Sequence, residues 1–212
     1  MNRLDKKEIW NYCEMVSSEE PKYLKDLIRE THLKTLAPQM LSESIMGRML
    51  SFVSHMVQPK SILEIGTFTG YGTLCLAEGL SPNGTITTIE VNPELQSISS
   101  KYFEKSPYTY QINALQGDAF NLIDALDIGF DLIYLDAGKK NYLKMYELVL
   151  PKLNQGKFIL VDNTLWSGKV VSPSQDLVTK SLQEFNLFLK SDQRVNVLLL
   201  PIRDGITLIQ KQ

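Results

Sequence analysis

Acidic residues follow one strand-like segment after another in this 212-residue chain. They are Glu64, Glu90, Asp118, Asp136 and Asp162. Each alone is explained as a turn or helix-cap residue. However, the carboxyl ends of parallel strands share one edge of a sheet, so five such residues would repel one another unless a cation or a donor-rich ligand compensates. The spacing therefore predicts a ligand site at that edge.

Part of this edge has the chemistry of a metal site. Asp136, Asp162 and Asn163 offer hard oxygen ligands, which suit Mg²⁺, Mn²⁺ or Ca²⁺ better than Zn²⁺. Ordinary strand-end capping explains the same residues equally well. Lys139, three residues after Asp136, is either a solvated surface residue like Lys140 or a general base, because an ammonium beside a metal cation loses its proton more readily.

A glycine-rich turn, SILEIGTFTGYG, precedes these residues and predicts the cofactor end of the site. Its short apolar strand stops at Gly66, and Gly70 and Gly72 let the backbone approach a ligand closely. Glu90 lies at a suitable spacing to accept hydrogen bonds from a ribose diol. The glycine pattern is G-x-x-x-G-x-G rather than G-x-G-x-x-G. It therefore weakens the interpretation as a nicotinamide dinucleotide site and leaves room for another adenosine-containing ligand.

Alternating strands and helices are expected to position these residues. The predicted strands are Ile62–Ile65, Thr85–Glu90, Gln111–Leu115, Phe130–Leu135, Phe158–Val161, Val195–Leu200 and Thr207–Gln210. The predicted helices between them are Gly72–Leu80, Pro93–Lys105, Asn121–Leu126, Asn141–Leu153 and Leu177–Lys190. This alternation predicts an α/β fold with a mostly parallel sheet covered on both faces. The Asp204-Gly205 turn signal predicts that the last two strands pair antiparallel.

The first 58 residues predict a helical N-terminal extension of a single domain that spans 1–212. Apolar residues at helical spacing indicate three helices before Pro59. We expect Ser17 or Ser18 to cap the second helix, and Ser42 to cap the third with Glu43 in its first turn.

Composition narrows the class of protein. The formal charge of −2 and the pI near 5.8 give no overall attraction to nucleic acid or to an anionic membrane. Cys13 and Cys75 form no CxxC motif, and the charged N-terminus lacks the apolar core of a signal peptide. We therefore expect a cytoplasmic protein with neither a nucleic-acid nor a membrane partner.

The chain resembles the cation-dependent O-methyltransferases that use S-adenosylmethionine, the group containing the catechol and caffeoyl-CoA O-methyltransferases. The matching segments are LEIGTFTGYGTL, TTIEVNPEL, GDA, LIYLDAGKKNY, LVDNTLWSG and DGITL, in family order from about Met40 to the C-terminus. The first segment alone is moderately specific, and its combination with LDAxKxNY and VDNxLWxG is strongly so. The resemblance implies a Rossmann-like class I methyltransferase fold, a seven-stranded sheet with an antiparallel C-terminal strand, and a homodimer.

The resemblance also implies a role for each matching residue. Asp136, Asp162 and Asn163 correspond to the metal ligands, and Lys139 to the general base. Trp166 and Ser167 fall where the family contacts its substrate, although Trp166 is equally interpreted as a core aromatic. The implied cofactor-binding residues are Met40, Glu64, Gly66, Thr67, Phe68, Tyr71, Gly72, Glu90, Asp118, Ala119 and Asp136.

Three residues depart from the family pattern. Gly138 stands where many relatives have a second acid, and Gly72 stands where a Ser is usual, so each removes a cofactor contact. Ser167 replaces the Asn of the plant enzymes, which puts their CoA-ester specificity in doubt here.

The predicted function is methyl transfer from S-adenosylmethionine to a hydroxyl of a small catechol-like aromatic, assisted by a divalent cation, most simply Mg²⁺, and by Lys139. Three alternatives stay open. The chain could be a metal-independent methyltransferase of the same fold, a nicotinamide-dependent oxidoreductase, or a binder of S-adenosylmethionine without catalysis.

Overall fold

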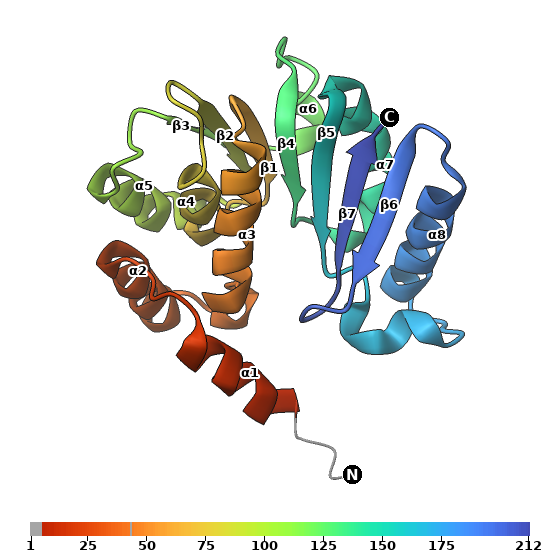
Figure 1. The fold of residues 1–212 in the computed structure, drawn as a ribbon, viewed down its shortest axis with the longest axis horizontal. Coiled ribbons are helices and arrows are strands. Elements are labelled where there is room, and N and C mark those ends of the chain that lie inside the picture. The colour runs from red at the N-terminus through yellow and green to blue at the C-terminus, as the bar shows by residue number, and fades with distance from the viewer. Residues whose placement is uncertain (1–5, 43) are drawn as a thin grey trace.

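A single mixed sheet organises the part of the chain that the computed structural model describes, residues 6–42 and 44–212. Its seven strands have the order β3-β2-β1-β4-β5-β7-β6 (Figure 1). They are β1 (Ser61–Ile65), β2 (Thr85–Glu90), β3 (Ile112–Gln116), β4 (Phe130–Leu135), β5 (Leu153–Asp162), β6 (Val195–Leu200) and β7 (Ile206–Lys211). Strands β1 to β5 pair in parallel, and β7 is antiparallel to both β5 and β6. The predicted mostly parallel sheet with an antiparallel C-terminal strand is confirmed.

Helices cover the sheet in two groups. Buried residues of α2, α3, α4 and α5 cluster on one face, and those of α7 and α8 cluster on the other. The α-helices are α1 (Lys6–Val16), α2 (Lys22–Lys34), α3 (Ser44–Val57), α4 (Tyr71–Ala77), α5 (Gln96–Lys105), α6 (Ala119–Leu122), α7 (Tyr142–Val149) and α8 (Leu177–Ser191). Short 3₁₀ turns are η1 (Pro38–Met40), η2 (Pro93–Leu95), η3 (Lys139–Asn141), η4 (Leu150–Lys152) and η5 (Trp166–Val171).

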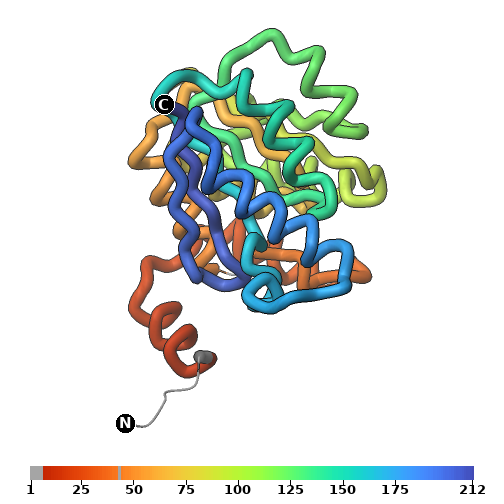
Figure 2. Tube along the Cα trace, turned by 90° about the vertical axis from the view of Figure 1, so that its right-hand side faces the viewer, coloured from red at the N-terminus to blue at the C-terminus, as the bar shows by residue number. Residues whose placement is uncertain are grey.

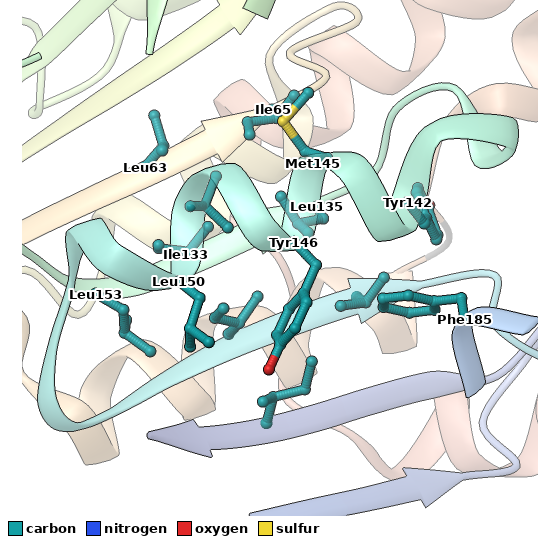
Figure 3. Packing of buried hydrophobic residues seen from close by; sticks show 14 of the residues in the cluster. Leu63, Ile65, Ile133, Leu135, Tyr142, Met145, Tyr146, Leu150, Leu153 and Phe185 are labelled. Atoms are coloured by element: carbon teal, nitrogen blue, oxygen red, sulfur yellow. The ribbon is translucent and has the colours of Figure 1, made fainter. Parts of the chain in front are cut away.

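Aromatic packing holds α7 and α8 against the sheet. Figure 3 shows Met145 and Tyr146 of α7 among the strand residues, with Phe185 of α8 beside them. The rings of Tyr146 and Phe185 meet edge to face at 6.1 Å, a favourable arrangement for two aromatic rings. The Tyr146 hydroxyl also donates to Asp192 at 2.7 Å. This packing holds α7, which begins at Tyr142 directly after the 3₁₀ turn that contains Lys139.

Two predicted element boundaries were wrong for identifiable reasons. Strand β5 begins at Leu153, five residues before the predicted start, because its exposed polar residues at 154–157 hide the apolar pattern. Helix α6 spans only Ala119–Leu122, and it begins earlier than predicted because the Asp118 side chain accepts a hydrogen bond from the Phe120 N–H at 2.9 Å. Asp118 is therefore a helix cap, whatever else it does.

Of the caps predicted for the N-terminal helices, the one for the second helix was wrong and the one for the third stays a prediction. Helix α2 begins after Pro21 with no side-chain cap, so the predicted capping by Ser17 or Ser18 was wrong; the Ser17 hydroxyl instead donates back to the Cys13 carbonyl at 2.6 Å. Helix α3 begins at Ser44. Glu43 lies outside the described residues, and the capping role of Ser42 stays a prediction.

Helix α1 projects away from the sheet in both views (Figures 1 and 2). It leaves Ile9, Tyr12, Met15 and Val16 exposed. The predicted homodimer stays a prediction. In the described part of the chain, no helix has the length and apolar character to cross a membrane.

The strand order reverses between β1 and β4, and the chain is pinned tightly there. The Asp136 N–H donates to the Ile65 carbonyl at 2.9 Å, and the Gly66 N–H donates to the Ile89 carbonyl at 3.0 Å. A Cβ on Gly66, whose φ is +103°, would lie 2.1 Å from the Asp136 carbonyl oxygen. Only glycine fits this close crossing. In open α/β sheets, ligands bind at such a switch point.

Gly66→Ala should lower the free energy of unfolding by about 2 kcal/mol or more, because it adds backbone strain to a clash with the Asp136 carbonyl. Gly138→Ala is the matched control: Gly138 has a φ of −60° and nothing within 4 Å of the added Cβ, so its effect should stay within about 0.5 kcal/mol. Urea unfolding of both variants tests this. Equal stability of the two would contradict the close-crossing account.

Candidate functional site

A cavity of about 1070 Å³ opens at the carboxyl ends of the parallel strands. The segment 34–42 and the turns after β1 to β5 surround it. It brings together four of the five predicted strand-end acids, and Asn163 with them. The predicted site residues that line it are Met40, Gly66, Phe68, Glu90, Asp118, Ala119, Asp136, Lys139, Asp162, Asn163 and Trp166.

One end of the cavity is built around Glu90, the last residue of β2. Its carboxylate accepts hydrogen bonds from the Phe68 N–H at 2.7 Å and the Asn92 N–H at 2.8 Å. These bonds hold the carboxylate in one orientation, and each oxygen keeps a lone pair for another donor. Asp118 and Ala119 line the same end. The arrangement suits a hydroxyl-bearing sugar with a ring beside it.

Glu64 lies beneath this cavity, fully buried in β1. Its Oε2 accepts hydrogen bonds from the hydroxyls of Thr73 and Thr88, while its Oε1 is buried with no partner. Burial and the charges of Asp136 and Glu90 raise the pKa of Glu64 to about 8. An orphaned buried acceptor is costly, so Oε1 is a candidate contact for a donor on a ligand.

The residues around Glu64 form a smaller pocket of about 20 Å³ next to the main cavity. Thr67, Tyr71 and Gly72 line it, and their predicted contacts with the cofactor stay predictions. A Cβ on Gly72 would lie 2.7 Å from Glu64 Oε1, so glycine leaves room for the Glu64 carboxylate. The Tyr71 hydroxyl donates to Glu20, which ties this turn to the N-terminal extension.

Asp136 and Asp162 line the main cavity and form what we call its acidic centre. The Lys139 ammonium donates to Asp136 Oδ1 at 2.7 Å, and both side chains are about one-fifth exposed. Asp162 Oδ1 accepts from the Asn163 N–H at 2.7 Å, and Asp162 Oδ2 accepts from the Tyr134 hydroxyl at 3.1 Å. Burial and the charge of Asp136 raise the pKa of Asp162 to about 6. The two carboxylates therefore lie close enough to repel each other.

Sequence reasoning missed the supporting role of two tyrosines. Tyr134 bonds to the Asp162 carboxylate, and Tyr142 donates to the Asp162 carbonyl at 3.0 Å. The alternation of β4 offered a signal for Tyr134, because it lies two residues before Asp136 on the same face of the strand.

The segment after Asn163 bends sharply. Asn163, Trp166 and Ser167 have φ values of +58°, +49° and +53°. Trp166 lines the cavity, and its buried Nε1 has no hydrogen-bond partner. Ser167 does not belong to the cavity lining; its backbone N–H donates to the Asp204 carboxylate. Its predicted substrate contact stays a prediction.

Comparison with known proteins identifies the family. A sequence model described as O-methyltransferase matches residues 14–212. Caffeoyl-CoA O-methyltransferases from Petunia hybrida and Zea mays are each 32% identical to this chain over 205 residues, covering 91% of it and 84% and 79% of the two plant proteins. The chain belongs to the O-methyltransferase family that includes these enzymes.

Solved structures agree with this O-methyltransferase assignment. The SAH-bound methyltransferase PaMTH1 of Podospora anserina has a TM-score of 0.91 at 27% identity, covering 100% of this chain and 98% of that one. An O-methyltransferase from Bacillus cereus, in complex with SAH, has a TM-score of 0.90 at 23% identity and shows the shared fold; the match covers 97% of each chain. The protein is an S-adenosylmethionine-dependent O-methyltransferase.

The site fits this cofactor. Glu90 keeps carboxylate lone pairs that can accept hydrogen bonds from sugar hydroxyls, and Glu64 Oε1 is a buried acceptor near the close backbone turn at Gly66. The nicotinamide alternative is set aside by the family assignment, as is binding without catalysis.

The fit to a divalent cation rests on donor chemistry alone. Asp136, Asp162 and Asn163 line one part of the cavity with oxygen-bearing side chains, and a cation would relieve the repulsion between the two carboxylates. In residues 6–42 and 44–212, no three His, Cys, Asp or Glu side chains are grouped to hold a metal. The cation stays a prediction.

The pKa of Glu64 gives a test of the cofactor pocket. This pKa is about 8 in the folded chain against an ordinary 4.5, so between those pH values the folded state binds more protons than the unfolded state. The contribution of Glu64 to the free energy of unfolding therefore falls as the pH rises through that window. Glu64→Gln removes the titration. Urea unfolding without cofactor should show that the free energy of unfolding of wild type, relative to that of Glu64→Gln, falls up to about pH 8 and is then constant. A difference in unfolding free energy that does not depend on pH would contradict the raised pKa of Glu64.

Proposed function

We propose that this methyltransferase acts on one hydroxyl of a small aromatic with two adjacent hydroxyls, assisted by a divalent cation and by Lys139 as general base. The observation that carries the proposal is the placement of Lys139 against Asp136 at 2.7 Å, in the same cavity as Asp162 and Asn163. A bound cation would relieve the repulsion between the two carboxylates, and a lysine beside it would be placed to act as a base.

The chain's own residues divide the work. Glu90 and the Glu64 pocket bind the cofactor and so orient its methyl group toward the acidic centre. Asp136, Asp162 and Asn163 would hold the cation, with Tyr134 fixing the Asp162 carboxylate. Trp166 lines the same cavity and would contact the acceptor. Exclusion of water and alignment of the reacting groups supply much of the rate acceleration.

The acceptor must lose a proton before it is a good nucleophile. A neutral phenol has a pKa near 10, like that of tyrosine. A bound divalent cation supplies Lewis acidity that favours the phenolate form of the acceptor. The positive charge of a cation bound nearby would favour loss of the Lys139 ammonium proton to solvent, and the neutral amine would then take the proton from the acceptor oxygen. Asp136 then holds the resulting ammonium by the contact already present in the structure.

A metal-independent methyltransferase of the same fold is the second candidate. The two carboxylates already have partners in Lys139, Tyr134 and the Asn163 N–H, so the cluster is also compatible with a structural role. Chelator sensitivity separates the two candidates.

Removal of the cation should abolish turnover. Dialysis against EDTA should reduce methyl transfer to a catechol to background, and added Mg²⁺ should restore it. Asp162→Asn, which keeps the side-chain shape, should lower kcat by at least about 100-fold. Asp127→Ala is the matched control, since Asp127 is an exposed acid before β4, at the other end of that strand. Full turnover in excess EDTA would leave only the metal-independent candidate.

The two adjacent lysines allow a sharp test of the base. Lys139→Met should lower kcat by about 100-fold to 10,000-fold, the usual contribution of a general base, and should leave binding of S-adenosylmethionine unchanged. Lys140→Met removes an exposed neighbouring charge and should leave kcat unchanged. Single-turnover rates with labelled cofactor measure both. Equal rates for the two variants would rule out Lys139 as the base.

A further inference from the structure

Arg203 belongs to the turn between β6 and β7 and lines the same cavity as Asp136 and Asp162. It is half-buried, and no step described so far uses it. Its positive charge lowers the pKa of Asp162 against the stronger effects of burial and Asp136. The guanidinium therefore acts within the reach of the acidic centre.

The turn that carries Arg203 is held firmly in place. The Leu165 N–H donates to the Asp204 carbonyl at 2.8 Å, and the Thr164 N–H donates to the Gly205 carbonyl at 3.1 Å. A Cβ on Gly205 would lie 2.6 Å from the Leu165 nitrogen, so the two segments cross closely. Arg203 is thus positioned by the same stretch of chain that follows the proposed metal ligands.

The backbone at Arg203 does not favour an arginine. Its φ of +49° lies in the left-handed region, which is less favourable for a residue with a side chain than for glycine. Glycine would satisfy the turn geometry with less strain. A function of the guanidinium in the cavity explains why a large side chain occupies the position.

The strand order places Arg203 on the acceptor side of the site. Glu90 ends β2, and the β6–β7 turn lies at the opposite end of the order β3-β2-β1-β4-β5-β7-β6. The acidic centre, after β4 and β5, lies between them (Figure 1). A ligand that reaches from the acidic centre toward Arg203 therefore extends away from the Glu90 end of the cavity, where the cofactor's sugar is expected.

We propose that Arg203 binds a carboxylate on the acceptor, so that the preferred substrate is a catechol carrying an acidic side chain; this inference rests on the proposed function. A guanidinium has five N–H donors in a planar fork that matches a carboxylate. It can therefore keep a contact with its own chain and still bind the substituent. The hydroxyls of such an acceptor lie at the acidic centre, and its carboxylate lies at the β6–β7 turn.

Two acceptors that differ only in charge test the proposal. The value of kcat/KM is measured for caffeate and for its neutral analogue caffeyl alcohol, in wild type, Arg203→Gly and Arg203→Lys. For Arg203→Gly we expect kcat/KM for caffeate to fall by about tenfold or more through KM, the effect of losing a charge-assisted hydrogen bond. The values for caffeyl alcohol and the KM for S-adenosylmethionine should not change. Arg203→Lys should restore part of the preference.

Lys34→Ala is the matched control. Lys34 also lines the cavity, but its ammonium pairs with Glu30 at 2.8 Å. It should leave the ratio of the two acceptors unchanged. An equal drop in kcat/KM for caffeate in Arg203→Gly and Lys34→Ala would mean that only the overall electrostatic potential of the cavity matters. This result would overturn the proposed contact between Arg203 and the carboxylate.

Other outcomes are equally decisive. Equal losses for both acceptors in Arg203→Gly would show that Arg203 supports the acidic centre instead, and a rise only in the KM for S-adenosylmethionine would assign it to the cofactor; either result overturns the proposal.

Calorimetric binding of both acceptors in the presence of SAH runs in parallel. If wild type turns over neither acceptor, the proposed function fails, while selective loss of caffeate binding in Arg203→Gly still supports the carboxylate contact. Equal binding of both acceptors to wild type and Arg203→Gly overturns it.

Discussion

The repulsion between Asp136 and Asp162 is the constraint on which the rest of the site depends. Parallel pairing of β4 and β5 brings these two carboxylates to one edge of the sheet, and burial raises the pKa of Asp162 to about 6. Lys139, Tyr134 and the Asn163 N–H all point at this pair. Asn163, whose φ is positive, donates its N–H to the Asp162 carboxylate, and the proposed cation would relieve the repulsion between the two charges.

The sequence predicted the sheet and its acidic edge because both follow from local patterns. Apolar runs such as LIYL predict buried parallel strands. The carboxyl ends of such strands share one edge of the sheet, which places Asp136 and Asp162 on the same edge. Glu90 was found in the same way, from its spacing to Gly66. These inferences needed no knowledge of which helix packs where.

Other features depend on tertiary contacts that a sequence pattern does not carry. The unpaired Oε1 of Glu64 arises from the space left by Gly72. The role of Tyr134 appears only once β4 and β5 are aligned, and the helix α2 begins without the serine cap that its sequence indicated. Arg203 lies in a turn and belongs to no motif of the sequence, and only the structure places it in the lining of the cavity. The family assignment defines the cofactor and the reaction, whereas the choice of acceptor is proposed to depend on Arg203.

Direct measurement of cation binding tests the central claim without relying on any acceptor. The EDTA-stripped enzyme with bound SAH is titrated with Mn²⁺ and followed by calorimetry or by electron paramagnetic resonance, in wild type and in Asp162→Asn. The account predicts one ion per chain in wild type, displaced by Mg²⁺, and no saturable binding in Asp162→Asn. No binding to wild type, or equal binding to both proteins, would contradict it and leave the acidic pair as a structural feature of a metal-independent methyltransferase.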